Sequence, residues 1–254
     1  MIRLKSKEEI EILREGGRRH AEILKLVAKV VAPGISTKSL DILAQRLIKE
    51  GGDKSAFLGY TPEGVSYPYP AALCVSINDE VVHGIPNKDV LLEEGDIVSL
   101  DLGLKHRGLI TDGAITVPVG KVSKAAKDLI AATKKALELA VKAAKPGNTT
   151  GDIGHAVESF VKPLGYGIVK ILSGHGVGYS VHEDPYVPNY GQPGKGEKLV
   201  PGMVIAIEPM LNLGTGTVYA TDDEYTYITK DGKISAHFEH TVAITEKGPV
   251  ILTK

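Results

Sequence analysis

Apolar residues recur at helical spacing in two separate parts of the chain, and each part contains two such stretches. The pattern predicts helices over residues 6–32 and 37–50 in the first part, and over 123–145 and 150–164 in the second. A capping-box pattern at Ser6 marks the start of the first helix. Strand-like apolar runs follow each pair of helices, so both parts share the order helix, helix, strands.

The breaks between these helices match. Pro33-Gly34 separates the first two helices and Pro146-Gly147 the second two, an offset of 113 residues (146 minus 33). Pro and Gly end many helices, so this match alone is weak. We expect one α+β domain over 1–254 with a plan that is repeated in roughly 1–120 and 121–254, and with helices outside a central antiparallel sheet.

Two acidic residues occupy matching places in these halves. When Gly95 is placed on Gly202, an offset of 107 residues (202 minus 95), Asp101 falls on Glu208. Each acid stands alone at the end of an apolar, strand-like run. A buried charge is unfavourable unless a partner compensates it, and a metal ion is a common partner. The match favours an internal duplication and indicates one site built from two halves.

A hairpin is predicted around the first of these acids. With a turn centred between His106 and Arg107, Asp101 would lie directly opposite Asp112, with Cβ atoms roughly 4.5–5.5 Å apart. Two carboxylates so close repel each other, and a divalent cation would turn that repulsion into ligation. The alternative is a solvated edge hairpin with exposed acids, which the apolar flanks of both residues argue against.

The second half supplies two more strand-borne acids, Glu208 and Glu239. With Asp101 and Asp112 they carry four negative charges, which match two divalent ions. Carboxylates that bridge two ions are typical of two-metal hydrolytic sites.

Three histidines stand in contexts that suit a site. His175 lies between two glycines, His182 follows seven residues later, and His83 follows a strand-like run. Taken singly, each is more often structural than functional. The other histidines that we assign to structural roles are His20 and His155, on helix surfaces, and His106, in a turn.

Composition excludes several classes of protein. The 254 residues are 43% hydrophobic and 24% charged, with a net charge of −1, so nothing indicates binding to nucleic acid or to an anionic membrane. No apolar run is long enough to span a membrane, and no signal peptide is visible. The single cysteine, Cys74, excludes an internal disulfide and suits the reducing cytoplasm, where we expect the protein.

Five motifs together resemble those of the methionine aminopeptidases, in the same order and from about Ile2 to the C-terminus. They are Ser99-Leu100-Asp101-Leu102-Gly103, Thr111-Asp112-Gly113-Ala114-Ile115-Thr116, Gly174-His175-Gly176-Val177-Gly178, Ile207-Glu208-Pro209-Met210 and Phe238-Glu239-His240-Thr241. The resemblance implies the pita-bread fold, whose two halves are related by a pseudo-twofold axis. The compact length resembles that of the bacterial type I enzymes, without an N-terminal extension.

The resemblance also implies a role for each motif. It implies two divalent ions per chain (Co, Mn, Fe, Zn or Ni): Asp101 binds one ion, Asp112 and Glu239 bridge both, and His175 and Glu208 complete the second. Glu208 would also move protons. By the same resemblance, His83 and His182 contact the substrate and assist catalysis.

A side-chain pocket for methionine is implied as well. The matching positions are Tyr60, Tyr69, Cys74, Val181 and Tyr225. Val181 stands where an aromatic residue is usual, and the stretch Thr61 to Pro68 is longer than in compact relatives. His237 occupies a position where glutamine is frequent, and strand alternation predicts that it faces the metals.

The implied reaction is removal of the initiator methionine from nascent proteins and peptides, preferably before a small second residue. We expect a monomer without membrane or nucleic-acid partners, for which transient ribosome contact is compatible with the function. Two alternatives remain: a proline-specific aminopeptidase or dipeptidase of the same fold, and a non-catalytic binding protein of that fold. The first usually carries an additional N-terminal domain, and the second usually lacks metal ligands.

Overall fold

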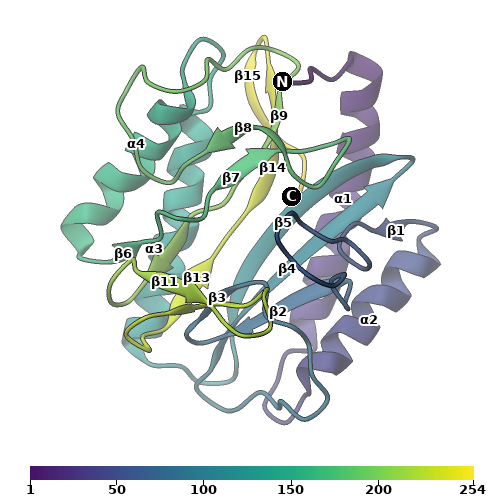
Figure 1. Ribbon diagram of the computed structural model, residues 1–254, viewed down its shortest axis with the longest axis vertical. Coiled ribbons are helices and arrows are strands. Elements are labelled where there is room, and N and C mark those ends of the chain that lie inside the picture. Colours follow the sequence, from purple (N-terminus) through teal and green to yellow (C-terminus); the bar gives the residue numbers. More distant parts are fainter.

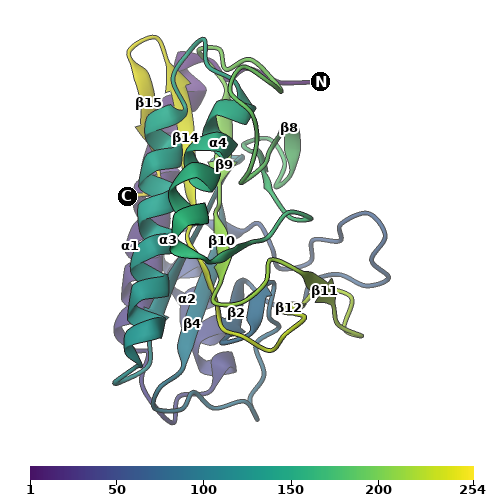
Figure 2. The same ribbon diagram turned by 90° about the vertical axis from the view of Figure 1, so that its left-hand side faces the viewer.

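The computed structural model describes all residues, 1–254, and places the helices on one side of a set of antiparallel sheets (Figures 1 and 2). The helices are α1 (Lys7–Lys29), α2 (Thr37–Glu50), α3 (Lys124–Ala143) and α4 (Thr150–Val161), which continues into the 3-10 turn η1 (Lys162–Leu164). Long loops lie on the opposite side of the sheets, as Figure 2 shows. No helix combines the length and the apolar character needed to cross a lipid bilayer.

Two larger sheets form the centre. The first contains β1 (Lys54–Ser55), β4 (Ile97–His106), β2 (Leu73–Ile77) and β5 (Leu109–Pro118). The second runs in the order β15 (Gly248–Ile251), β14 (His240–Thr245), β9 (Val204–Ile207), β7 (Gly174–Gly176) and β8 (Glu183–Val187). Two smaller sheets join β13 (Ser235–His237), β10 (Met210–Asn212) and β6 (Gly167–Ile168), and β11 (Val218–Ala220), β12 (Tyr227–Thr229) and β3 (Glu80–Val82).

The four predicted helices are confirmed, with ends set by local chemistry. Ser6 accepts the amide of Glu9 and Glu9 accepts the amide of Ser6, so the predicted capping box is present. The apolar face of α1 and α2 packs on the first sheet around residues such as Val27 and Leu100, and that of α3 and α4 packs on the second. Burial of each such side chain contributes about 1.5–3 kcal/mol.

The two halves use equivalent hydrogen bonds. The amide of Gly34 donates to the carbonyl of Leu92 (2.7 Å), and the amide of Gly147 donates to that of Leu199 (2.8 Å). Both pairs obey the offsets read from the sequence, 113 at the helix break and 107 at the strand entrance. Both glycines have positive φ, 84° and 93°, in the region that favours glycine. The repeated motif therefore fixes the same local structure twice.

The register predicted for the first hairpin is wrong by two residues. Arg107 and Gly108 form the turn, with φ of 47° and 92°, so Asp101 pairs with Ala114 and Asp112 pairs with Gly103. A two-residue turn with positive φ matches the right-handed twist of the strands, which the assumed turn centre did not allow for. The shift is even, so both acids stay on one face as diagonal neighbours. Asp101 lies within β4 rather than at its end.

Two of the three structural histidines lie elsewhere than expected. His20 is buried, and burial lowers its pKa to about 4; His106 ends β4, where its Nδ1 lies 2.7 Å from Oδ1 of Asp53. The predicted helix surface and turn were wrong because α1 approaches the sheet closely at Gly16, where a Cβ atom would lie 2.9 Å from that of His106. His155 is exposed on α4, as predicted.

Candidate metal centre and substrate cavity

One cavity of about 780 Å³ brings together side chains from both halves of the chain. Its lining contains every residue that the sequence assigned to metal, catalysis or the side-chain pocket: Asp101, Asp112, His175, Glu208, Glu239, His83, His182, Tyr60, Tyr69, Cys74, Val181 and Tyr225. The cavity lies on the side of the sheets that the helices leave uncovered.

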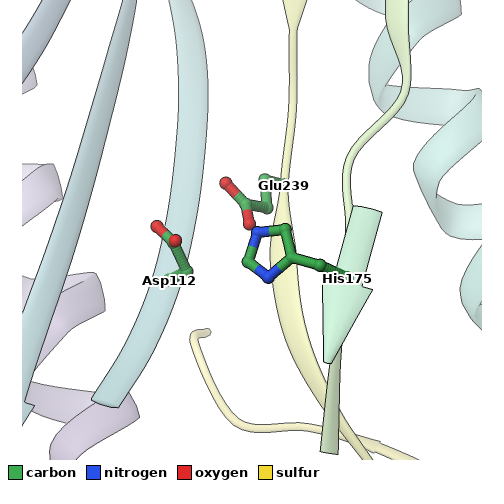
Figure 3. Close-up of side chains that lie close together, drawn as sticks. All are labelled: Asp112, His175 and Glu239. Atoms are coloured by element: carbon green, nitrogen blue, oxygen red, sulfur yellow. The ribbon is translucent and has the colours of Figure 1, made fainter. Parts of the chain in front are cut away.

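Three of the candidate ligands form a compact group. Oxygen atoms of Asp112 and Glu239 and a ring nitrogen of His175 all lie within 4.8 Å of one another, and Figure 3 shows the side chains converging from separate strands. Glu208 adjoins them, with Oε1 3.4 Å from Nε2 of His175. Asp101 lies on the same face of the hairpin as Asp112 and is buried.

The two halves meet at this group. The backbone of Glu239 exchanges hydrogen bonds with Ala114 of β5, at 2.9 and 3.4 Å. Thr241 of β14 does the same for Asp112: its Oγ1 donates to the carbonyl of Asp112 (2.7 Å) and accepts from its amide (2.8 Å). Asp112 and Glu239 are therefore held by main-chain contacts rather than by flexible loops.

The charges of the group require a cation. Burial raises the pKa of Asp101 to about 7 and that of Glu208 to about 8, and burial also raises the pKa of Asp112 and Glu239 well above the usual range. Asp101 Oδ1 and Glu239 Oε1 have no hydrogen-bond partner. Burial lowers the pKa of His175 to about 3, which leaves the neutral imidazole that binds metals. Buried, unpartnered donors of this type fit divalent metal ions.

His237 lies beside the glutamates, as strand alternation predicted. Its Nε2 lies 3.6 Å from Oε2 of Glu208 and 4.0 Å from Oε2 of Glu239, and neither ring nitrogen has a hydrogen-bond partner. The ring is almost fully buried and does not line the cavity, so it stands behind the carboxylates.

Two further histidines face the cavity from opposite sides. His182 Nδ1 is hydrogen-bonded to the hydroxyl of Tyr60 at 2.9 Å, and its ring packs edge-on against His175. His83 has φ of 61°, which is uncommon outside glycine, and burial lowers its pKa to about 4. Both rings are therefore available in the neutral form at pH 7.

An aromatic wall completes the cavity. The rings of Tyr67 and Tyr69 each pack edge-on against Tyr225, with centroids 5.2 and 5.0 Å apart. Cys74 and Val181 are buried at the same cluster. This wall forms an apolar pocket beside the acids, which suits an apolar side chain next to a reacting bond.

The model of metallopeptidase family M24 matches residues 11–246. The chain belongs to this family. The methionine aminopeptidase of Aquifex aeolicus (strain VF5) is 49% identical to this M24 metallopeptidase, over 100% of this chain and 99% of the relative. A crystal structure of methionine aminopeptidase from Thermotoga maritima has a TM-score of 0.95 at 43% identity and covers all of both chains. Prolidase from Pyrococcus furiosus matches less closely, with a TM-score of 0.77 at 27% identity over 99% of this chain and 65% of its own. These similarities confirm the predicted pita-bread fold.

Several residues of the M24 cavity were missed. Phe57, Pro62, Val82, Leu172, Ser173 and Met210 also line it. Leu172-Ser173 and Met210 adjoin the His175 and Glu208 motifs, so proximity in sequence offered a clue to them. Pro62 belongs to a long loop, for which the sequence offered none.

Proposed function

We propose that this metallopeptidase removes the N-terminal methionine from proteins and peptides, preferably before a small second residue. The observation that carries the proposal is that five candidate metal ligands, two histidines and an aromatic pocket share one cavity. Such a cavity can hold an N-terminal residue by its side chain while its first peptide bond lies at the acids.

Two divalent ions of the group Co, Mn, Fe, Zn and Ni are proposed, held by Asp101, Asp112, His175, Glu208 and Glu239. When bound, such ions lower the pKa of a water molecule and polarise the carbonyl of the scissile bond. Asp101, on β4 beside Asp112, is proposed to lie on the side that receives the free amine of the substrate. Recognition of that amine restricts cleavage to the first peptide bond.

Glu208 is the proposed proton carrier. Its carboxyl has a pKa of about 8, raised by burial, and its side chain is slightly exposed to the cavity. A carboxyl poised near neutral pH can accept a proton from the attacking water and return it to the leaving nitrogen.

His182 and His83 are proposed to bind the peptide on either side of the reacting carbon. When the hydroxyl of Tyr60 donates to Nδ1 of His182, a neutral ring carries its proton on Nε2 and can donate it to the developing oxyanion. His83 would contact the scissile amide from the opposite side. Tyr60, Tyr69, Cys74 and Tyr225 would surround the methionine side chain.

The test compares Met-Ala-Ser with an Xaa-Pro peptide after EDTA treatment and addition of single metals. We expect cleavage of Met-Ala-Ser that is lost with EDTA and restored by at least one of Mn²⁺, Fe²⁺ or Co²⁺. Preference for the Xaa-Pro peptide would select the proline-specific alternative, and binding without turnover would select the non-catalytic one. Our further proposals are that 1–254 acts as one cytoplasmic, monomeric catalytic domain and that it meets nascent chains, with transient ribosome contact, at their N-termini.

A further inference from the structure

A loop between β1 and β2 begins and ends in the cavity wall. The amide of Tyr69 donates to the carbonyl of Tyr60 (2.8 Å), and the amide of Gly59 donates to the carbonyl of Tyr69 (2.9 Å). Both tyrosines line the cavity, so the eight residues Thr61–Pro68 form an excursion whose base is part of the site. We call this excursion the outer loop. The segment between β1 and β2 projects from the open side of the sheets in Figure 2.

The outer loop is fastened to a distant turn, Asp223–Tyr225. Both carboxylate oxygens of Glu224 accept hydrogen bonds from Ser66, one from its amide (2.7 Å) and one from its hydroxyl (2.8 Å). The hydroxyl of Tyr67 donates to the carbonyl of Asp223, and the hydroxyl of Tyr225 donates to that of Tyr67, each at 2.5 Å. Four hydrogen bonds thus join segments that lie about 158 residues apart in the chain.

The turn that holds the loop is itself braced. Asp223 accepts hydrogen bonds from the amides of Tyr225 (2.8 Å) and Thr226 (2.7 Å) and from the hydroxyl of Thr226 (2.7 Å). Glu224 has φ of 62°, a left-handed conformation that costs a non-glycine residue roughly 1–2 kcal/mol. The bracing by Asp223 offsets this cost and aims the Glu224 carboxylate at Ser66.

We propose that the outer loop is a fixed wall at the mouth of the cavity and that it selects the second residue of the substrate. The argument rests on the proposed function. The aromatic pocket takes the first side chain, so the peptide beyond the scissile bond must leave through the mouth. Pro62, half-buried, lines that mouth with a rigid ring one residue outside the Tyr60–Tyr69 base. A wall that cannot retreat admits a small second side chain and excludes a large one.

Glu224→Gly tests the wall because glycine keeps the positive φ and removes only the carboxylate. The ratio of kcat/KM for Met-Ala-Ser to that for Met-Leu-Ser should fall about tenfold relative to the unmutated chain. Ser66→Ala should lower the ratio in the same direction by less, and Ser66→Thr, which keeps the hydroxyl, should restore it. Glu63→Gln is the matched control, because Glu63 is an exposed acid of the same loop without a hydrogen bond or ion pair, and it should leave the ratio unchanged.

Cleavage after Glu63 by a glutamyl endopeptidase gives a second measurement that needs no peptidase turnover. It should accelerate at least about fivefold in Glu224→Gly, because a released loop reaches the protease more often. Faster cleavage with an unchanged peptide ratio would overturn the selectivity, and unchanged cleavage would overturn the fastening. If the unmutated chain turned over neither peptide, the proposed function would fail and the selectivity with it, while the proteolysis would still report on the fastening.

Discussion

Nε2 of His175 lies 3.4 Å from Oε1 of Glu208, although the two side chains come from different strands of the second sheet, β7 and the end of β9. The contact brings a neutral imidazole against a carboxyl whose pKa burial raises to about 8. The same carboxylate is therefore a candidate both for metal binding and for proton transfer.

Glu208→Gln separates these two roles. The amide keeps an oxygen donor but cannot carry the proton, so we expect metal to bind more weakly and kcat for Met-Ala-Ser to fall by about 10²–10⁴-fold. Isothermal titration with Mn²⁺ and steady-state kinetics would measure the two effects. Full turnover in this variant would exclude Glu208 as the proton carrier. Glu246→Gln, at an exposed acid outside the cavity, serves as the control.

Metal removal should make stability depend on pH. Asp101 and Glu208 have folded-state pKa values of about 7 and 8, raised by burial above their ordinary values of 3.8 and 4.5. The folded state therefore binds more protons than the unfolded state, and stability falls as pH rises through this range. Between pH 6.5 and 8 we expect the melting temperature of EDTA-treated protein to drop by about 5 °C.

The pH window avoids the buried histidines. The pKa of His20 and that of His240 are lowered by burial to about 4, so their effect on stability is complete above pH 6.5. Mn²⁺ should raise the melting temperature more at pH 8 than at pH 6.5, because bound metal replaces the protons. A metal-free protein that becomes more stable over this window would contradict the assignment of the raised pKa values.

Local pattern predicted the ligands but not their exact register. Asp101 and Asp112 could be placed on one face because side-chain direction alternates strictly along a strand. The pairing depended on Arg107 adopting positive φ, which an arginine does not announce. The match of Gly34 with Gly147, in contrast, predicted two equivalent structures, because glycine at a helix end has a narrow range of uses.

Contacts between distant segments were beyond the reach of the pattern. His20 looked like a surface residue, since its burial depends on how closely α1 approaches the sheet. The bond between Glu224 and Ser66 joins two exposed loops, where polar residues are expected in any case. Periodicity identifies the buried face of an element, but it does not identify the partner that covers a loop.

Tyr60→Phe should weaken catalysis through His182. The lost hydrogen bond, 2.9 Å long, holds the ring orientation and favours one tautomer, which is worth about 0.5–1.5 kcal/mol. We expect kcat/KM for Met-Ala-Ser to fall about three- to tenfold, with metal affinity unchanged. Tyr219→Phe, at a tyrosine that is 49% exposed, should have no effect. An equal loss in both variants would show that Tyr60 does not act through His182.

Lys5→Met should destabilise the fold and disturb the loop that carries His182. Lys5 Nζ donates to Glu183 at 2.6 Å, and the two side chains are only 1% and 7% exposed. Loss of the ammonium leaves a buried carboxylate without its ion-pair partner, which costs about 3–5 kcal/mol. Urea denaturation would measure it, with the exposed Lys7→Met as control. The double variant Lys5→Met/Glu183→Gln should recover part of the loss, because no charge then remains buried; no recovery would mean that packing by the lysine stem, rather than the ion pair, supplies the stability.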